Sequence, residues 1–285
     1  MVLNFLANAI IVSSMYALVA IGLTLIYSVG GVFNLAHGVN VAIGAWLTWY
    51  LVAELGLSIW IGVAGALIVP ALFSLALYWG MIRRIEDAPI IVMTVTLLIE
   101  IISEYFLRST FGVQSTTVPQ ILSGNVNILG TSIQANLLLA FVVSWILIIA
   151  LFLFINRSKF GKALTAISMS QKGPSLVGID SGRMYAATWL VAGMLAGLAG
   201  LFFGSYRGAS WLIGQSSLFI AFPIVVLGGI GSIRGSVLAA YIIGFIEIGT
   251  ITYYDPSMSG LIPFLLLIAI LLVRPQGLLG RRVEA

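Results

Sequence analysis

Four polar side chains interrupt apolar stretches of the sequence: Asn34, His37, Glu100 and Glu247. Asn34 and His37 are three positions apart, so they share one face if their segment is helical. A charge that faces lipid at the bilayer centre costs about 2.5–3.5 kcal/mol, so Glu100 must face protein or water, or be protonated. All four residues are candidates for a translocation path. The alternative is that they make hydrogen-bonded packing contacts, with Asn34 and His37 satisfying backbone groups freed by a broken helix.

The sequence lacks the residue sets on which common enzyme chemistry depends. It has one His and no Cys, which excludes a paired-His metal site and thiolate chemistry. The only local resemblance to a phosphate loop, Gly161-Lys162-Ala163, lacks the upstream glycine and the hydroxyl that would meet magnesium. We therefore expect no enzymatic activity, no metal and no cofactor on this chain.

Composition indicates the environment in which these side chains lie. The chain has 285 residues, of which 61% are hydrophobic and only 8% charged, too few charges to cover a soluble domain. We predict an all-α polytopic membrane protein, because a helix needs about 20 apolar residues to cross a bilayer. The candidate spans are roughly 3–27, 36–55, 57–82, 90–109, 136–155, 185–206, 216–230, 236–253 and 260–273, which gives eight or nine crossings.

Glycines subdivide the predicted spans. One glycine-interrupted segment in each half, near 30–38 and 228–235, is typical of a discontinuous helix beside a transport pathway. A second pattern is the set of glycines at three- and four-residue spacing in the sixth span, which lets helix backbones approach closely. Its members are Gly193, Gly197, Gly200 and Gly204.

Basic residues predict the orientation in the membrane. They cluster in gaps between spans, and cytoplasmic loops carry an excess of Lys and Arg. Placing all clusters in the cytoplasm gives an extracytoplasmic N-terminus, a cytoplasmic C-terminus and an external loop at 112–135 with a short ordered piece. The clusters are Arg83 and Arg84; Arg157, Lys159, Lys162, Lys172 and Arg183; and Arg274, Arg281 and Arg282.

The segment at about 156–183 is the largest polar interruption. Phe160, Leu164 and Ile167 have the spacing of a short amphipathic helix, and Gly173-Pro174 separates them from a second short piece that ends at Gly178. The first helix either lies on the lipid surface or docks a cytoplasmic protein. No segment is long enough for a soluble domain, so we expect one transmembrane domain over 1–285 and any energy-converting domain on another chain.

Several of these segments resemble one family. Residues 22–38, with Phe33-Asn34-Leu35-Ala36-His37-Gly38, and residues 226–235, with Leu227-Gly228-Gly229-Ile230-Gly231, are similar to the signatures of the branched-chain amino acid (Liv-type) ABC permeases. The loop at 161–180 and the tail at 273–280 are similar as well. The chain resembles the shorter, H-type subunit of that family more than the M-type.

The resemblance implies a subunit of an importer in a prokaryotic inner membrane. An extracytoplasmic binding protein would deliver the solute, a second related or identical permease would complete the path, and two cytoplasmic ATPases would bind ATP and Mg²⁺. The loop would then couple the permease to the ATPases. The coupling residues would be Phe160, Leu164, Ile167, Lys172, Pro174, Leu176, Val177 and Gly178. The chain departs from the family at Lys172–Ser175, where relatives have an acidic residue and two alanines.

Two other functions fit the same residues. Urea and short-chain amide permeases resemble this family closely, so the solute remains open. A stand-alone secondary transporter would instead use Glu100, Glu247 and His37 for ion coupling. The absence of a nucleotide motif together with the basic loop favours the ATP-driven importer.

Overall fold

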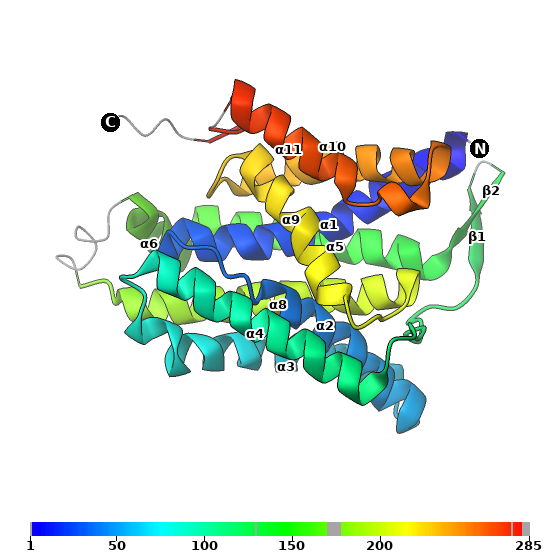
Figure 1. Cartoon of the computed structure of the whole chain (residues 1–285), viewed down its shortest axis with the longest axis horizontal. Helices are drawn as coiled ribbons and strands as arrows, with labels where there is room; N and C mark the ends of the chain where they lie inside the picture. Colours follow the sequence, from blue (N-terminus) through cyan, green and yellow to red (C-terminus); the bar gives the residue numbers. More distant parts are fainter. Residues whose placement is uncertain (1, 129, 170–177, 275, 281–285) are drawn as a thin grey trace.

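The computed structural model describes residues 2–128, 130–169, 178–274 and 276–280, and it is a helical bundle (Figure 1). The first half contains α1 (Val2–Gly30), α2 (His37–Trp49), α3 (Ile59–Gly80) and α4 (Pro89–Phe111). The middle contains α5 (Ala135–Arg157) and α6 (Lys159–Met169). The second half contains α8 (Ser181–Arg207), α9 (Ile213–Gly228), α10 (Ile233–Tyr253) and α11 (Leu261–Val273). Short turns of other helix types are η1 (Tyr50–Glu54), η2 (Ile82–Arg84) and η3 (Pro256–Met258).

The helices fall on the predicted spans and confirm a polytopic membrane protein. Within the described residues, six helical segments are long and apolar enough to cross a bilayer. They are Val2–Gly30, Ile59–Arg84, Pro89–Phe111, Ala135–Arg157, Ser181–Arg207 and Ile233–Tyr253. The α9 and α11 helices are shorter, with 16 and 13 residues, and α2 has 13 residues before it continues into η1.

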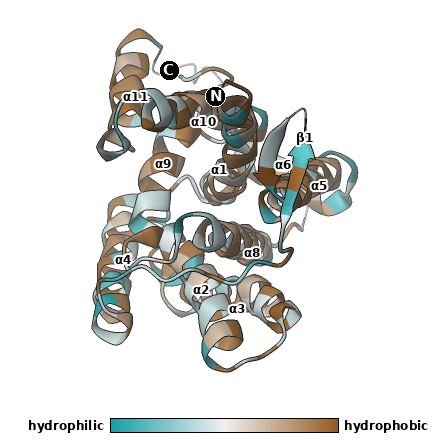
Figure 2. Cartoon of the chain, turned by 90° about the vertical axis from the view of Figure 1, so that its right-hand side faces the viewer, coloured by the Kyte–Doolittle hydropathy of each residue, from teal (hydrophilic) through white to brown (hydrophobic). Residues whose placement is uncertain are grey.

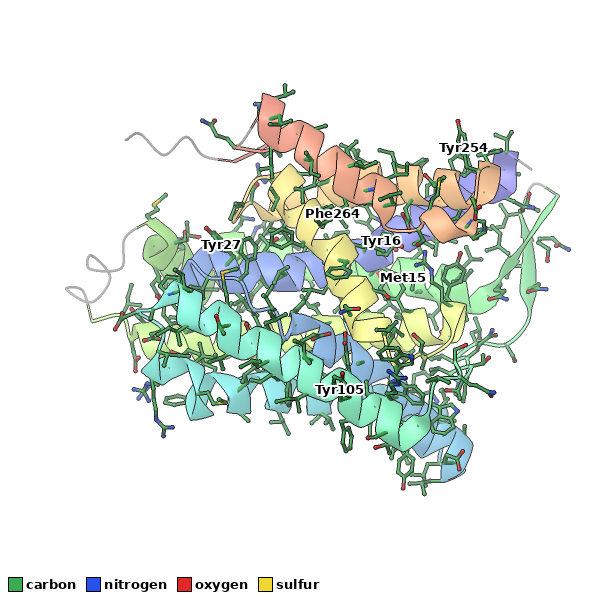
Figure 3. The ribbon with its side chains drawn as sticks, viewed as in Figure 1. Met15, Tyr16, Tyr27, Tyr105, Tyr254 and Phe264 are labelled. Carbon is green, nitrogen blue, oxygen red and sulfur yellow. The ribbon has the colours of Figure 1, made fainter. Side chains whose placement is uncertain are left out.

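The bundle has two distinct ends (Figure 1). The α6 end contains α6, the end of α1 and the end of α11, while the hairpin end contains the start of α1 and an antiparallel hairpin of β1 (Asn125–Ile128) and β2 (Thr131–Gln134). This hairpin is the ordered piece expected in the loop at 112–135. Exposed Tyr254 lies near the hairpin end and Tyr27 toward the α6 end (Figure 3).

The two halves run in opposite directions. The α1 helix runs from the hairpin end to the α6 end, and α8 runs the other way (Figure 1). Packing follows the same relation, because α1 packs on α10 as α8 packs on α3, and α2 packs on α3 as α9 packs on α10. This arrangement is an inverted-topology repeat, which in transporters places the substrate site at the interface of the two halves.

The core is formed by α1 and α8, which lie between the other helices. From Ile11 to Ile26 every residue of α1 is buried, as expected for a helix that is apolar all round. The outward faces of the peripheral helices are also apolar (Figure 2). On α3 and α4, for example, Trp60 and Ile90 are exposed, and these faces suit lipid.

The glycines of α8 pack against neighbouring helices, as predicted. A Cβ atom added at Gly197 would lie 2.2 Å from the carbonyl oxygen of Ala66 on α3. One added at Gly200 would lie 2.0 Å from the carbonyl oxygen of Val41 on α2. Both distances are far below van der Waals contact, so the backbones could not approach this closely with larger residues.

The breaks in the halves differ in part from the prediction. The first half is interrupted at residues 31–36, within the predicted segment at 30–38. The glycines near 228–235 instead form the turn between α9 and α10 at the α6 end. The inverted-repeat counterpart of the first break is at residues 208–212, where α8 ends and α9 begins.

Candidate functional site

The break at residues 31–36 is held by side chains that bind its free backbone groups. The Oδ1 atom of Asn34 accepts a hydrogen bond from the N–H of Ala36 at 3.0 Å. The hydroxyl of Thr96 on α4 accepts one from the N–H of Leu35 at 3.1 Å. Backbone outside a regular helix at membrane depth needs such partners. Asn34 therefore satisfies a backbone group freed by the break, which is the packing role considered above.

His37 fastens the start of α2 to the middle of α1. Its Nε2 atom lies 3.0 Å from the carbonyl oxygen of Val19, so this nitrogen carries the proton and donates. Gly22 leaves space for the ring, because a Cβ atom there would lie 2.8 Å from the ring Cε1. The ring is fully buried. His37 thus fixes where α2 begins.

The first turns of α2 and α9 meet at Glu100, and we call Gly38, Gly214 and Glu100 the junction. Gly38 and Gly214 are the second residues of their helices. A Cβ atom at Gly38 would lie 2.5 Å from the Gly214 carbonyl oxygen and 2.7 Å from Glu100 Oε1. One at Gly214 would lie 2.8 Å from the Gly38 carbonyl oxygen and 2.9 Å from Glu100 Oε1. Only glycine fits at either position.

The junction is electrostatically suited to an anion. Each helix N-terminus carries a partial positive charge of about half an elementary charge. The N–H groups of His37, Val39 and Ile213 also bond to the carbonyl oxygens three residues before them. The carboxyl group of Glu100 lies against both N-termini and interacts with the backbone N–H of Val39. Glu100 is 3% exposed, and its Oε2 atom has no hydrogen-bond partner among the described residues. The Nδ2 atom of Asn34 and the Nδ1 atom of His37 also lack one.

Glu247 lies apart from the junction, near the hairpin end of α10. Its carboxylate accepts hydrogen bonds from the hydroxyl of Ser259 and, at 3.0 and 3.1 Å, from the N–H of Gly260. Gly260 precedes the first residue of α11, so Glu247 caps that helix. The structure therefore brings Asn34, His37 and Glu100 to one region and places Glu247 in another.

Comparison with known proteins identifies the family. Residues 5–271 match the model of the branched-chain amino acid transport system permease component. The chain belongs to this family. It is 30% identical to the high-affinity branched-chain amino acid transport system permease protein LivH of Salmonella typhimurium, over 96% of this chain and 94% of that one. It is also 30% identical to BraD of Pseudomonas aeruginosa, described in the same words, over 98% and 96%.

An archaeal relative is similar to the same extent. The probable branched-chain amino acid transport permease protein LivH of Methanocaldococcus jannaschii is 30% identical over 96% of this chain and 91% of its own. No solved structure matches the chain. As a multi-pass permease component the chain is a transport subunit rather than an enzyme. Its described residues contain no cluster of His, Asp and Glu that could hold a metal ion.

In the permease, α6 packs its apolar face inward. Leu164 and Ile167 are buried, and they join a cluster with Ile26 and Val29 at the end of α1. Phe160 is half-buried against the same cluster. These predicted coupling residues therefore hold α6 on the bundle. Its exposed face carries Lys159, Lys162, Thr165 and Ser168.

The rest of the predicted coupling loop lies partly outside the described residues. Lys172, Pro174, Leu176 and Val177 belong to that undescribed part. Gly178 has φ +79°, a left-handed conformation that favours glycine. Next to it, Asp180 caps α8 by accepting a hydrogen bond from the N–H of Arg183 at 3.1 Å.

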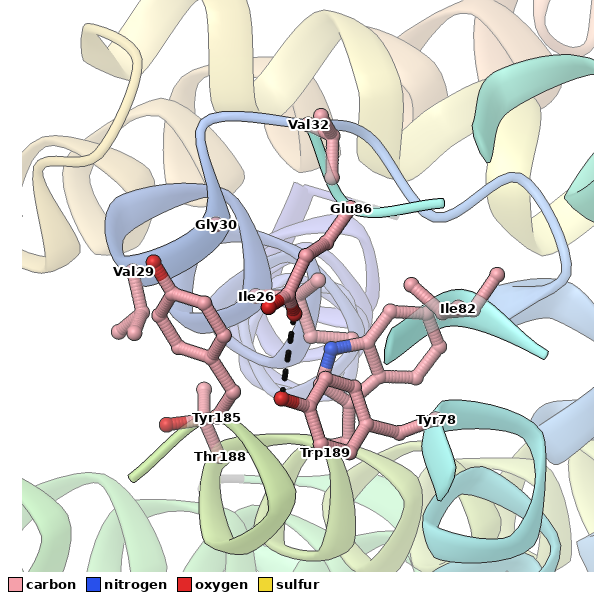
Figure 4. A pocket seen from close by; sticks show the side chains of 10 residues that line it. All are labelled: Ile26, Val29, Gly30, Val32, Tyr78, Ile82, Glu86, Tyr185, Thr188 and Trp189. Atoms are coloured by element: carbon pink, nitrogen blue, oxygen red, sulfur yellow. Dashed lines mark hydrogen bonds between the residues drawn. The ribbon is translucent and has the colours of Figure 1, made fainter. Parts of the chain in front are cut away.

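A pocket opens at the α6 end beside the first break (Figure 4). It lies between the end of α1, the end of α3 and the start of α8 and has a cavity volume of about 10 Å³, room for one water-sized molecule. The hydroxyl of Tyr78 donates to the Glu86 carboxylate at 3.2 Å inside it. Burial raises the pKa of the Glu86 carboxyl, which lies in the loop between α3 and α4, above its ordinary value.

Sequence reasoning missed three participants in these sites. Thr96 has no special pattern, and its role depends on α4 lying beside the break. Gly214 is isolated in the sequence, although a glycine directly after Trp211-Leu212-Ile213 could have suggested a close approach. Glu86 lies in a short charged loop with Arg83, Arg84 and Asp87, and nothing in that pattern indicates that its carboxyl group faces a pocket.

Proposed function

We propose that the chain is the membrane-spanning permease of an ATP-driven ABC importer for branched-chain or related amino acids. One observation carries this proposal: the chain matches permeases named for branched-chain amino acid transport over nearly its whole length. The whole chain, 1–285, acts as a single transmembrane domain.

The permease works with three kinds of partner. These are two cytoplasmic ATPases that bind ATP and Mg²⁺, a second permease that is related or identical, and an extracytoplasmic solute-binding protein. The α6 end faces the cytoplasm of a prokaryotic cell, with the N-terminus outside and the C-terminus inside. Eight of the ten Lys and Arg residues that the structure describes support this orientation, because they lie at the α6 end. They are Arg83, Arg84, Arg157, Lys159, Lys162, Arg183, Arg234 and Arg274.

The loop at 156–183 is the contact with the ATPases. The α6 helix is held on the bundle by Leu164, Ile167 and Phe160. Its exposed face, with Lys159 and Lys162, contacts the ATPase. We extend the contact to Lys172, Pro174, Leu176, Val177 and Gly178 on the grounds of the family resemblance.

The translocation path passes through the junction. Asn34 and His37 hold the break that forms one side of it, and Glu100 closes it at mid-depth. Glu247 holds the turn before α11 nearer the outer end of the path. Transporters commonly bind solute between the two repeats at discontinuous helices, which supports this placement.

Reconstitution of the importer tests the function. The permease with its partner permease, ATPases and binding protein is placed in proteoliposomes, and uptake of radiolabelled leucine, isoleucine, valine, urea and acetamide is measured with and without ATP. We expect ATP-dependent uptake of the three amino acids. If only urea or acetamide is taken up, the chain is a urea or amide permease and not an amino acid permease. If the chain alone takes up solute under an ion gradient, it is a secondary transporter and not an ATP-driven importer.

Charge reversal on α6 tests the coupling surface. Lys162→Glu should lower both ATPase association and leucine uptake. Arg84→Glu serves as the matched control, because Arg84 is also exposed at the α6 end but belongs to η2. If both variants lose association equally, the contact is not specific to α6.

A further inference from the structure

The junction matches the two charges of an amino acid zwitterion. We propose that the N-termini of α2 and α9 bind the carboxylate of the transported amino acid while Glu100 binds its ammonium group. This inference rests on the proposed function, since it assumes that an amino acid passes through the permease. It names the residues that would recognise the part common to all such solutes.

The carboxylate position is the one that Oε1 of Glu100 occupies in the structure. That oxygen lies where Cβ atoms at Gly38 and Gly214 would be 2.7 and 2.9 Å away, so it contacts the first turn of both helices. Half-helix N-termini that meet at mid-membrane are favourable sites for anionic groups, because free N–H groups and helix dipoles point at them. Glu100 is thus a tethered carboxylate at an anion site.

The position of the solute ammonium group follows from the missing partner of the Glu100 Oε2 atom. Its Oε2 atom is buried without a partner, and it forms no salt bridge with any described residue. A buried charge without a partner is costly, and a positively charged group beside it removes that cost. On the described parts of α2 and α9, no Lys or Arg can supply that charge.

Binding therefore requires an exchange at the junction. The solute carboxylate takes the place of Glu100 at the two helix N-termini, and the Glu100 carboxylate turns onto the solute ammonium group. The zwitterion is neutral overall, so the net charge of the junction is the same before and after. Each buried charge has an opposite partner in the loaded state, which keeps the desolvation cost low.

Analogues that lack one charge test the inference. Radiolabelled leucine is bound to the purified permease–ATPase complex in nanodiscs without binding protein, and unlabelled ligands compete. The competitors are leucine, 4-methylvalerate, which lacks the ammonium group, and 3-methylbutylamine, which lacks the carboxylate. We expect each analogue to compete at least about 10-fold more weakly than leucine, because a site built for a charged group rejects ligands without it.

Variants assign the two charges to their residues. In Glu100→Gln the preference for leucine over 4-methylvalerate should disappear. In Gly214→Ala the two carboxylate ligands should weaken more than 3-methylbutylamine. Glu54→Gln is the control, because Glu54 is an exposed carboxylate in η1, at the far end of the α2–η1 segment from Gly38, and should leave the preferences unchanged. Gel filtration and basal ATP hydrolysis report whether each complex is assembled.

Two results would overturn the inference. One is a Glu100→Gln complex that keeps the wild-type preference, and the other is a uniform loss of all three ligands in both the Glu100 and Gly214 variants. If Glu100→Gln does not assemble, Glu100→Asp replaces it, and loss of the preference despite a retained charge in an assembled complex counts against the assignment. Leucine uptake by the wild-type importer is measured separately, so a failed inference is distinguishable from a failed function.

Discussion

The two halves of the permease share an architecture but differ in the chemistry of their breaks. In the first half, Asn34, Thr96 and Glu100 surround the start of α2. In the second half, α11 corresponds to α4 and is apolar throughout, with Leu267 buried where it packs. The buried carboxylate of the second half is Glu247, which lies on α10 and caps α11 instead of facing the junction. The comparison teaches that the repeat supplies the geometry of the junction, while its charge comes from one half alone.

The largest expected effect comes from the contact that both halves share. Gly38→Ala should abolish leucine uptake and destabilise the complex by about 1–3 kcal/mol, because the added methyl group overlaps Gly214 and Glu100. Thermal denaturation and uptake measure it. Gly80→Ala on α3 is the control, since nothing lies within 4 Å of its added Cβ. Equal behaviour of the two variants would refute a close contact between the halves.

Removing the carboxylate of Glu247 should lower stability but leave the ligand preference unchanged. Glu247→Ala leaves the N–H of Gly260 and the hydroxyl of Ser259 without their partner, so we expect a loss of about 2 kcal/mol in thermal denaturation. The preference for leucine over its analogues should persist. A lost preference would show that both halves contribute charge, contrary to the comparison.

A smaller loss should follow from weakening the first break. Thr96→Val removes the acceptor for the Leu35 N–H and should cost about 1 kcal/mol of stability, read from thermal denaturation. Thr94→Val is the control, because the hydroxyl of Thr94 is exposed and bonds only within α4. If the control loses as much, the effect belongs to α4 and not to the break.

The smallest effect is expected at Glu86, which lies in the first half only. Its raised pKa means that the protonated form is favoured by folding, so its contribution is present at acid pH and is lost as pH rises through the folded pKa. Glu86→Gln should therefore slightly raise the denaturation temperature at pH 8 and leave it unchanged at pH 4. An equal shift at both pH values would point to packing instead of ionisation.

Much of the fold could be predicted because membrane helices are marked by local composition. The apolar stretches located the helices, and the basic clusters marked one end. The break at 31–36 was visible because Asn34 and His37 stand out among apolar neighbours. The glycine-rich turn at 228–235 was mistaken for its counterpart, because the break at 208–212 contains only one glycine.

The site could be predicted only in part because its contacts join distant segments. The cost of a buried charge indicated that Glu100 faces protein, but not that it meets Gly214. The spacing of Leu164 and Ile167 revealed an apolar face on α6, but not whether lipid, an ATPase or the permease itself covers it. Such questions depend on tertiary packing, which a local pattern does not contain.

The inward face of α6 connects this helix to the start of α2 by a short path. Leu164 and Ile167 belong to the same buried cluster as Ile26, Val29 and Val32, so α6 packs beside the point where α1 ends. From Val32 the chain reaches Gly38 within six residues. A displacement of α6 by the ATPase would thus be transmitted along residues 32–38 to the first turn of α2, without passing through the length of any transmembrane helix.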